Sequence, residues 1–233
     1  MKKTLLTICL VWMCFSLSAQ KIIDLSGKWS FSIDRQDNGE KEKWFSHTLN
    51  DFINLPGSMP EKLKGDEVTA KTQWTGSLYD SSYYYNPYME KYRKEGNIKF
   101  PFFLTPDKHY VGAAWYQKEV NIPADWKGER ILLFLERPHI ETTVWVNGQK
   151  TGMQNSLCVP HQYDITRYVR PGKCTITIRV DNRIKEINVG PDSHSITDQT
   201  QGNWNGIVGR ICLQTTPKTY FDDIQIYPEP EIG

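Results

Sequence analysis

The residues best suited to chemistry lie in one short stretch, "DQTQGNWNGIVG", which runs from Asp198 to Gly209. It holds five side chains with an amide or a carboxylate, three glycines and one tryptophan. A sugar ring offers hydroxyl groups that donate and accept hydrogen bonds, and one apolar face of C–H bonds. The stretch supplies a partner for each of these features. We therefore predict a sugar-contacting loop with the side chains Asp198, Gln199, Asn203, Trp204 and Asn205.

Asp198 is expected to be the largest polar contributor of this loop. A hydrogen bond to a charged group contributes ~1.5–3 kcal/mol, whereas a neutral amide contributes ~1 kcal/mol. Arg137 and His139, in "ERPHIET", follow the end of a predicted strand and are further candidates for the edge of the pocket. Another interpretation stays open, because Asn and Asp often bond to the backbone of turns and Trp204 could close the end of a sandwich.

Short strands of alternating polarity must position this loop. Apolar residues alternate with polar ones in several segments, and residues 130–136 form a nearly continuous apolar run that is typical of a strand covered on both faces. Asn147-Gly148 is a strong hairpin signal. The pattern predicts an all-β fold, an antiparallel β-sandwich of the jelly-roll kind. The predicted strands are 27–33, 113–122, 130–136, 142–148, 174–182, 207–215 and 222–228.

Residues 56–108 do not follow this rhythm and form a long, irregular, tyrosine-rich insertion. A loop of this size within a compact domain indicates either a function or packing of its own. The aromatic wall predicted there could face a sugar or a neighbouring domain, and the sequence leaves both open. Its tyrosines are Tyr83, Tyr84, Tyr85 and Tyr88. Trp115 and Trp145 lie within predicted strands and are expected in the core.

The N-terminal 19 residues have the pattern of a secretory signal peptide: Lys2 and Lys3, an apolar stretch to Leu17, and a small-residue exit. We expect a secreted or periplasmic protein with one domain over residues 20–227. Residues 228–233, "PEPEIG", are expected to be a linker to a further C-terminal part. Without the two leader lysines, 26 basic residues face 27 acidic ones, which argues against a nucleic-acid or membrane partner.

Other kinds of site find little support in the sequence. Cys158, Cys174 and Cys212 are expected to be free thiols, with one disulfide as the alternative. The five histidines are isolated, and no Cys/His spacing suits zinc. The sequence contains neither a P-loop nor a nucleophile elbow. No pair of acids suggests the two carboxyl groups of a glycosidase, so we predict no catalytic residue and no cofactor.

The segments together resemble a known family. They run "LSGKWSFSID", "AWYQKEVNIPADWKGERILLFLERPHIETTVWVNGQKTG", "PHQYDITRYVRPGKCTITIRVDN" and "DQTQGNWNGIVGRICL". The specific motifs are Trp115-Tyr116, the "VWVNG" hairpin, "YDIT" followed by "PGK", and "GNWNGIVG". This order is similar to the N-terminal sugar-binding domain of glycoside hydrolase family two, which includes β-galactosidases, β-glucuronidases and β-mannosidases.

The resemblance implies a galactose-binding-like jelly roll that is followed by an immunoglobulin-like domain and a catalytic (β/α)₈ barrel. The family's catalytic glutamates lie on that barrel, so this stretch is expected to be inactive alone. The resemblance also implies that the acid matching Asp198 contacts the terminal sugar, partly through a bound cation. Tyr110 stands near a position where some relatives have an asparagine, which disfavours galactose.

Three hypotheses follow from the sequence. The first is an accessory sugar-binding domain of a secreted hydrolase acting on glycan β-glycosides. The second is a free-standing carbohydrate-binding module. The third is a structural sandwich that only packs against neighbouring domains.

Overall fold

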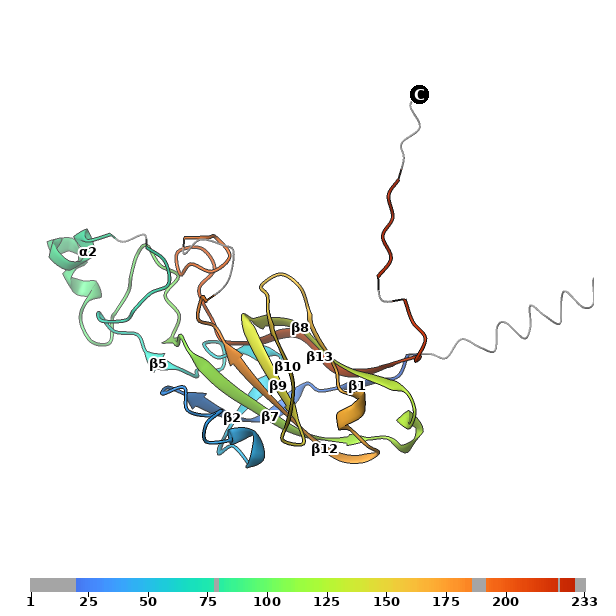
Figure 1. Cartoon of the computed structure of the whole chain (residues 1–233). Coiled ribbons are helices and arrows are strands. Elements are labelled where there is room, and N and C mark those ends of the chain that lie inside the picture. Colours follow the sequence, from blue (N-terminus) through green and yellow to red (C-terminus); the bar gives the residue numbers. More distant parts are fainter. Residues whose placement is uncertain (1–19, 78–79, 186–191, 222, 229–233) are drawn as a thin grey trace, which may run out of the picture.

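The chain folds into two large antiparallel β-sheets that pack face to face, with an irregular insertion at one end (Figure 1). The insertion adds a third, two-stranded sheet of β5 (Asp66–Glu67) and β6 (Lys108–His109), and the short helix α2 (Ser82–Tyr85). The computed structural model describes residues 20–77, 80–185, 192–221 and 223–228. The expected signal peptide and residues 229–233 of the expected linker therefore lie outside the described residues. Within the described part of the chain, no helix is both long and apolar enough to cross a membrane. The predicted sandwich is confirmed.

One sheet has six strands in the order β10-β9-β12-β7-β2-β3. Its hairpin between β9 and β10 turns at Asn147 and Gly148, whose φ angles are 50° and 76°. Two positive φ angles define the turn type that the Asn-Gly signal predicts. The strands are β2 (Gly27–Asp34), β3 (Asp51–Leu55), β7 (Ala113–Ile122), β9 (Glu141–Val146), β10 (Gln149–Asn155) and β12 (Gly172–Asp181).

The second sheet has the order β1-β13-β8-β11, and β4 pairs with the start of β13. The apolar run predicted as a doubly covered strand forms the inner strand β8. The pairing of β13 with β8 shifts register between Val208 and Ile211, where Gly209 has a φ of 75°. The strands are β1 (Ile22–Asp24), β4 (Gly57–Ser58), β8 (Arg130–His139), β11 (His161–Asp164) and β13 (Gly206–Thr216).

The main core lies between the sheets and takes alternate side chains from each strand, such as Leu133 and Leu135 of β8 and Ile176 and Ile178 of β12. Cys174 and Cys212 lie in strands and are buried free thiols, whereas Cys158 is an exposed free thiol. Burial raises the pKa of the Cys174 thiol to about 11.

Trp115 and Trp145 are buried, as predicted, but in a separate cluster with Leu49. Residues of the 3₁₀ turn η1 (Trp44–Ser46) cover this cluster, and the Phe45 ring stacks on the Trp145 ring at 5.1 Å. The Trp115 indole N–H donates to Asp34 at 2.9 Å. Both faces of this sheet are therefore packed around β7.

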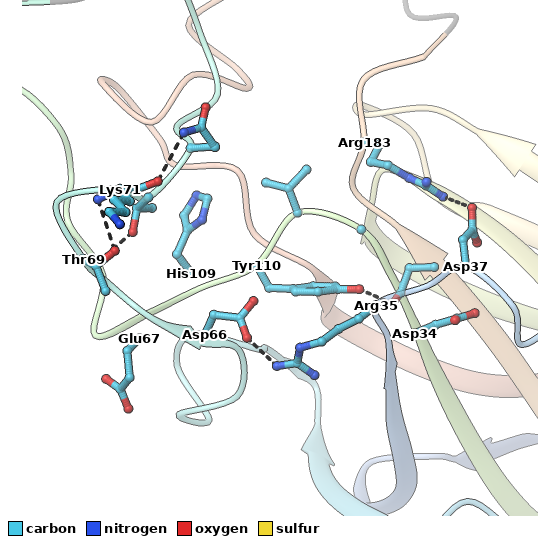
Figure 2. A pocket seen from close by; sticks show the side chains of 15 residues that line it. Asp34, Arg35, Asp37, Asp66, Glu67, Thr69, Lys71, His109, Tyr110 and Arg183 are labelled. Atoms are coloured by element: carbon cyan, nitrogen blue, oxygen red, sulfur yellow. Dashed lines mark hydrogen bonds and ion pairs between the residues drawn. The ribbon is translucent and has the colours of Figure 1, made fainter.

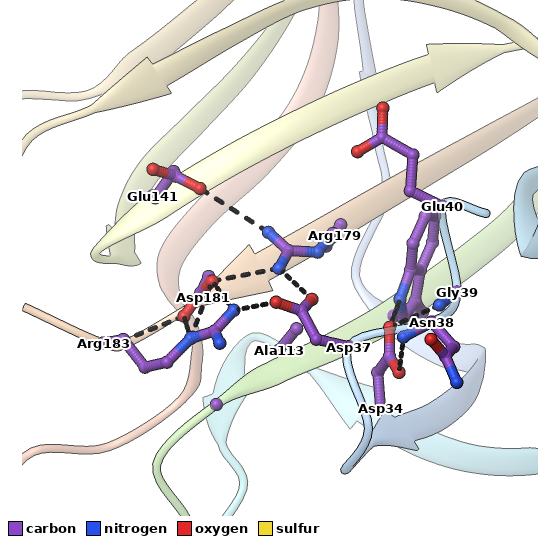
Figure 3. A network of polar contacts seen from close by, with 12 residues as sticks. Asp34, Asp37, Asn38, Gly39, Glu40, Ala113, Glu141, Arg179, Asp181 and Arg183 are labelled. Carbon is purple, nitrogen blue, oxygen red and sulfur yellow. Dashed lines mark hydrogen bonds and ion pairs between the residues drawn. The ribbon is translucent and has the colours of Figure 1, made fainter. Parts of the chain in front are cut away.

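An ionic network fastens the loop after β2 to the end of β12 (Figure 3). Arg179 donates to Asp37 at 2.6 Å and to Asp181 at 3.0 Å, and Arg183 contacts the same two carboxylates. Burial alone would raise the pKa of Asp181, but hydrogen bonds from Arg183 and Lys185 outweigh it and hold that pKa well below its ordinary value. Asp181 is thus an ionised group inside the protein.

The prediction of a strand over residues 222–228 is wrong for the described residues 223–228, which form no strand. Ile224, Ile226 and Tyr227 are at least 68% exposed there. A strand needs a neighbour for its backbone hydrogen bonds, and alternating polarity alone supplies none. Short 3₁₀ turns lie outside the sheets, as η2 (Pro87–Tyr92) in the insertion and η4 (Thr166–Tyr168) after β11.

Candidate functional site

The predicted sugar loop enters β13 through a close approach of two strands. Gly206 begins β13 and pairs with Ser58 of β4. Its φ is 148°, and a Cβ placed on it would lie 2.5 Å from the carbonyl oxygen of Gly57. Only glycine fits such a contact without moving the backbone. The sequence "NWNG" therefore needs its glycine in order to join the loop to the sheet.

The Asp198 carboxylate lies inside this loop, and its side chain is 2% exposed. It accepts hydrogen bonds from the backbone N–H groups of Thr75, at 2.6 Å, and Asn203, at 2.8 Å. His109 Nε2 lies 3.4 Å from the same carboxylate. The backbone carbonyl of Asp198 accepts from the N–H of Leu104 at 2.7 Å. Asp198 thus connects the loop to two parts of the insertion, at Thr75 and at Leu104. The alternative interpretation of the sequence, in which this acid bonds to the backbone of a turn, described these contacts in part.

Asn205 is fully buried, and its amide is used within the protein. Its Nδ2 donates to the carbonyls of Gly112 and Val180, at 2.9 and 3.0 Å, and its Oδ1 accepts from the Tyr116 hydroxyl at 2.7 Å. These bonds use both amide hydrogens, and the side chain has no exposed surface. The geometry gives Asn205 the role of a structural hub in place of the sugar contact that the sequence suggested.

Asn203 is also buried, but its hydrogen bonding is incomplete. Its Nδ2 donates to the Asn182 carbonyl at 2.9 Å and to the Thr75 hydroxyl at 3.0 Å. Because a carbonyl oxygen only accepts, the first bond fixes which end of the amide is the nitrogen. Its Oδ1 has no hydrogen-bond partner among the described residues. A buried acceptor without a donor is costly, and this oxygen is enclosed by the protein, so it is an unsatisfied polar group inside the loop.

Trp204 is half-buried and rests on His139. The two rings stack with their centroids 4.5 Å apart, and His139 Nδ1 donates to the Trp204 carbonyl at 2.7 Å. Arg137 is exposed on β8, opposite Val208. Gln199 is half-buried, and its buried Oε1 has no partner in the described part of the chain. The structure therefore places Trp204 and His139 in contact, whereas Arg137 is an exposed residue of the β8–β13 strand pair.

A pocket of about 540 Å³ opens beside Trp204 and is referred to below as the Trp204 pocket. Its polar lining residues are Ser58, Thr105, His109, Asp198, Gln201 and Asn203. Its apolar lining residues are Pro60, Phe103, Leu104, Pro106 and Trp204. A concave site with convergent polar groups and apolar walls is the usual form of a small-molecule pocket. The sequence predicted its loop side. From the insertion it predicted a wall of tyrosines as one alternative, but none of those tyrosines lines this pocket.

The insertion packs its own aromatic core, which explains how an irregular segment supplies a fixed wall. Tyr83 and Phe100 are almost fully buried and stack at 4.5 Å, and Trp74 contacts Phe100 and Phe103. The predicted wall of tyrosines divides accordingly: Tyr83 is in this core, whereas Tyr84, Tyr85 and Tyr88 are exposed. The high aromatic content of residues 56–108 was the available signal, but it does not tell which rings point inward.

A second pocket, of about 500 Å³, lies where the insertion meets the sandwich (Figure 2). It is strongly charged, and several of its charged groups are already paired. Arg35 contacts Asp66, and Arg183 contacts Asp37. His109 lines both this pocket and the Trp204 pocket. The second pocket therefore offers fewer free polar groups than its composition suggests.

The cation that the family resemblance implied near Asp198 does not fit the groups around this carboxylate. A hard cation takes several oxygen ligands. Both Asp198 carboxylate oxygens instead accept from backbone N–H groups, and the neighbouring side chain is a histidine. Among the described residues, no three His, Cys, Asp or Glu side chains cluster in a way that could hold a metal ion.

His139 and His161 are buried, and burial lowers the pKa of each to about 4. Both stay uncharged in the folded protein at neutral pH, whereas an unfolded chain protonates them near pH 6.5. The unfolded state therefore binds more protons between pH 6.5 and 4, so the free energy of unfolding should fall as the pH is lowered through this window.

We expect a loss of up to about 3 kcal/mol per histidine across that window. Denaturant titrations from pH 7 to pH 4.5 measure it. The variant His161→Asn should show a shallower pH dependence than the parent chain. Equal slopes for the two proteins would contradict the assignment of this effect to His161.

Residues 22–217 match the profile of the family described as "Glycosyl hydrolases family 2, sugar binding domain". The chain belongs to this family. The resemblance inferred from the sequence is therefore confirmed over nearly all of the described residues.

The matched relatives are longer proteins. The chain is 27% identical over 222 residues to a β-glucuronidase of Paenibacillus borealis, a match that covers 89% of this chain and 31% of that protein. It is 25% identical over 231 residues to the β-glucuronidase of Homo sapiens, with 87% and 30% covered. The chain thus spans about 30% of the length of these glycoside hydrolase family two relatives.

Solved structures share the fold. A Ruminococcus gnavus β-glucuronidase aligns with a TM-score of 0.58 at 18% identity, over 86% of this chain and 29% of that one. A β-glucuronidase from an uncultured Clostridium species aligns with a TM-score of 0.56 at 21% identity, over 86% and 30%. At these identities the likeness concerns the fold of the family two domain.

Proposed function

We propose that this family two domain serves as the N-terminal, sugar-binding part of a glycoside hydrolase that acts on glycan β-glycosides, with β-glucuronides as the favoured class. The observation that carries this proposal is the family match over residues 22–217. The choice of β-glucuronides rests on the names of its relatives. We further propose export of the protein, which rests on the signal-peptide pattern of its first 19 residues.

Chemistry would be supplied by further domains of the same enzyme. Hydrolysis with retention needs two carboxyl groups about 5–5.5 Å apart on either side of the scissile bond. We propose that a barrel, which follows an immunoglobulin-like domain, provides them, while this domain contributes the wall around Trp204. The half-buried Trp204 ring offers a flat apolar face, and the exposed Gln201 side chain offers an amide to the same pocket.

A second candidate function is a structural role in which the loop only holds domains together. The observation in its favour is that the side chains of Asp198 and Asn205 are occupied by internal hydrogen bonds. A free-standing carbohydrate-binding module is the remaining alternative. Sugar binding by the isolated chain distinguishes the binding roles from the structural one.

Calorimetric titration of the chain with glucuronate, galactose and mannose tests the proposal. We expect weak binding, strongest for glucuronate, and a loss of about tenfold in affinity for Trp204→Ala because a stacked aromatic ring contributes ~0.5–1.5 kcal/mol beyond its buried area. The matched control is Trp44→Ala, since Trp44 packs against the separate cluster of Trp115 and Trp145. Absence of heat with all three sugars would support the structural role.

A further inference from the structure

The apolar half of the Trp204 pocket comes from the insertion. Phe103, Leu104 and Pro106 all line it, and the Leu104 side chain belongs to a residue that is 52% exposed. Together these side chains form an apolar wall, and a ligand that covers apolar surface gains roughly 25 cal/mol per Å². The sugar-contacting loop does not cover this wall, so the pocket has one hydroxyl-binding side and one apolar side.

This apolar wall is fixed in place by the backbone. The N–H of Leu104 donates to the Asp198 carbonyl at 2.7 Å, and the N–H of Phe103 donates to the Phe100 carbonyl at 2.9 Å. The Phe103 ring stacks on Trp74 at 5.0 Å. Because these contacts already fix Phe103 and Leu104 in place, a ligand that binds to them need not order them, which lowers the entropic cost of binding.

The opposite side of the pocket is polar. Gln201 is exposed there and offers its amide, and Ser58 and Asn203 also line the pocket. A ligand that suits both sides carries hydroxyl groups on one part and an apolar group on another. The volume of about 540 Å³ lies within the range of roughly 300–1,000 Å³ that is usual for small-molecule sites.

We propose that the insertion makes the Trp204 pocket selective for glycosides that carry an apolar group beside the sugar, such as an aryl or alkyl aglycone. This inference rests on the proposed sugar-binding function and adds the chemical class of the aglycone. Leu104 and Phe103 are the residues that determine this specificity. The sugar part contacts the loop, and the aglycone contacts the wall.

The test compares methyl β-D-glucuronide with 4-nitrophenyl β-D-glucuronide by ligand-observed NMR titration of the whole chain. Covering roughly 60 Å² of apolar ring should make the aryl glycoside bind about tenfold more tightly. In Leu104→Ser this preference, measured as the ratio of the two affinities within the variant, should shrink to about twofold or less. The backbone bond from residue 104 to Asp198 does not depend on the side chain, so the variant should fold.

The matched control is Leu63→Ser, which removes another exposed leucine of the insertion, 63% exposed and outside the lining of the pocket. It should keep the full tenfold preference. Equal affinities for the two glycosides, or loss of the preference in both variants alike, would overturn the inference and leave the sugar-binding function standing. Lack of binding by either glycoside would overturn both.

Discussion

Replacing Asn205 with alanine should lower the free energy of unfolding by about 3–5 kcal/mol, because it leaves several buried polar groups without partners. The carbonyls of Gly112 and Val180 each lose a donor, which leaves Gly112 with the longer bond from the Asn182 N–H at 3.4 Å, and the Tyr116 hydroxyl loses its acceptor. Each unsatisfied buried group costs ~1–3 kcal/mol, and the site is too enclosed for water to replace the amide fully. Such a loss is a large share of the stability of an ordinary domain.

Urea titration of the parent chain and the variant measures this change. Asn205→Asp tests the chemical cause, because it keeps the size of the side chain and removes its two donors toward the carbonyls. It should be at least as destabilising as the alanine variant. The matched control is Asn121→Ala, an exposed asparagine of β7, which should change the free energy of unfolding by less than ~0.5 kcal/mol. A stable Asn205→Ala that fails only in sugar binding would contradict the structural role.

Replacing Asp181 with asparagine should also cost about 3–5 kcal/mol, because it removes the central charge of a buried network. Asp181 is fully buried and contacts Arg179, Arg183 and Lys185. Without its carboxylate, the buried Arg179 guanidinium keeps Asp37 and Glu141 as its only ion-pair partners in the described part of the chain. An under-compensated buried charge is the main cost, and the asparagine amide repays little of it.

The pH dependence provides a second check on this network. The folded-state pKa of Asp181 lies well below its unfolded value near 3.8, so its contribution is present above that value and is lost only as the pH falls through the lowered pKa. The difference between parent and Asp181→Asn should therefore be constant from pH 5 to pH 8. Asp66→Asn, in an exposed pair with Arg35, is the control and should change stability by ~0–1 kcal/mol. A similar loss in both variants would refute the buried-network argument.

The insertion shows most clearly which structural features a sequence pattern can predict and which it cannot. Its length and tyrosine content indicated packing or function, and the structure shows packing around Tyr83 and Phe100. The residues that line the Trp204 pocket from this side, Phe103 and Leu104, carried no signal of their own. Their position depends on hydrogen bonds to Asp198 and Phe100, and one of these joins residues 94 positions apart in the sequence.

The predicted loop residues differ in their hydrogen bonding for a similar reason. An amide in a turn can bond to a ligand or to the protein, and residue type does not distinguish the two. Asn205 meets the Gly112 and Val180 carbonyls only because β7 begins and β12 ends beside it, whereas Asn203, two residues earlier, keeps one acceptor without a donor among the described residues. Trp204 stays at the pocket because the His139 ring stacks against its ring.

The sequence by itself determined the antiparallel sandwich, most of its strands, the Asn147-Gly148 hairpin and the family, because these depend on the local alternation of polarity and on turn chemistry. Only the tertiary structure decided which polar side chains are used inside the protein and which are left for a ligand. That choice depends on contacts between segments that are distant in the chain, and the cost of an unpaired buried group settles it.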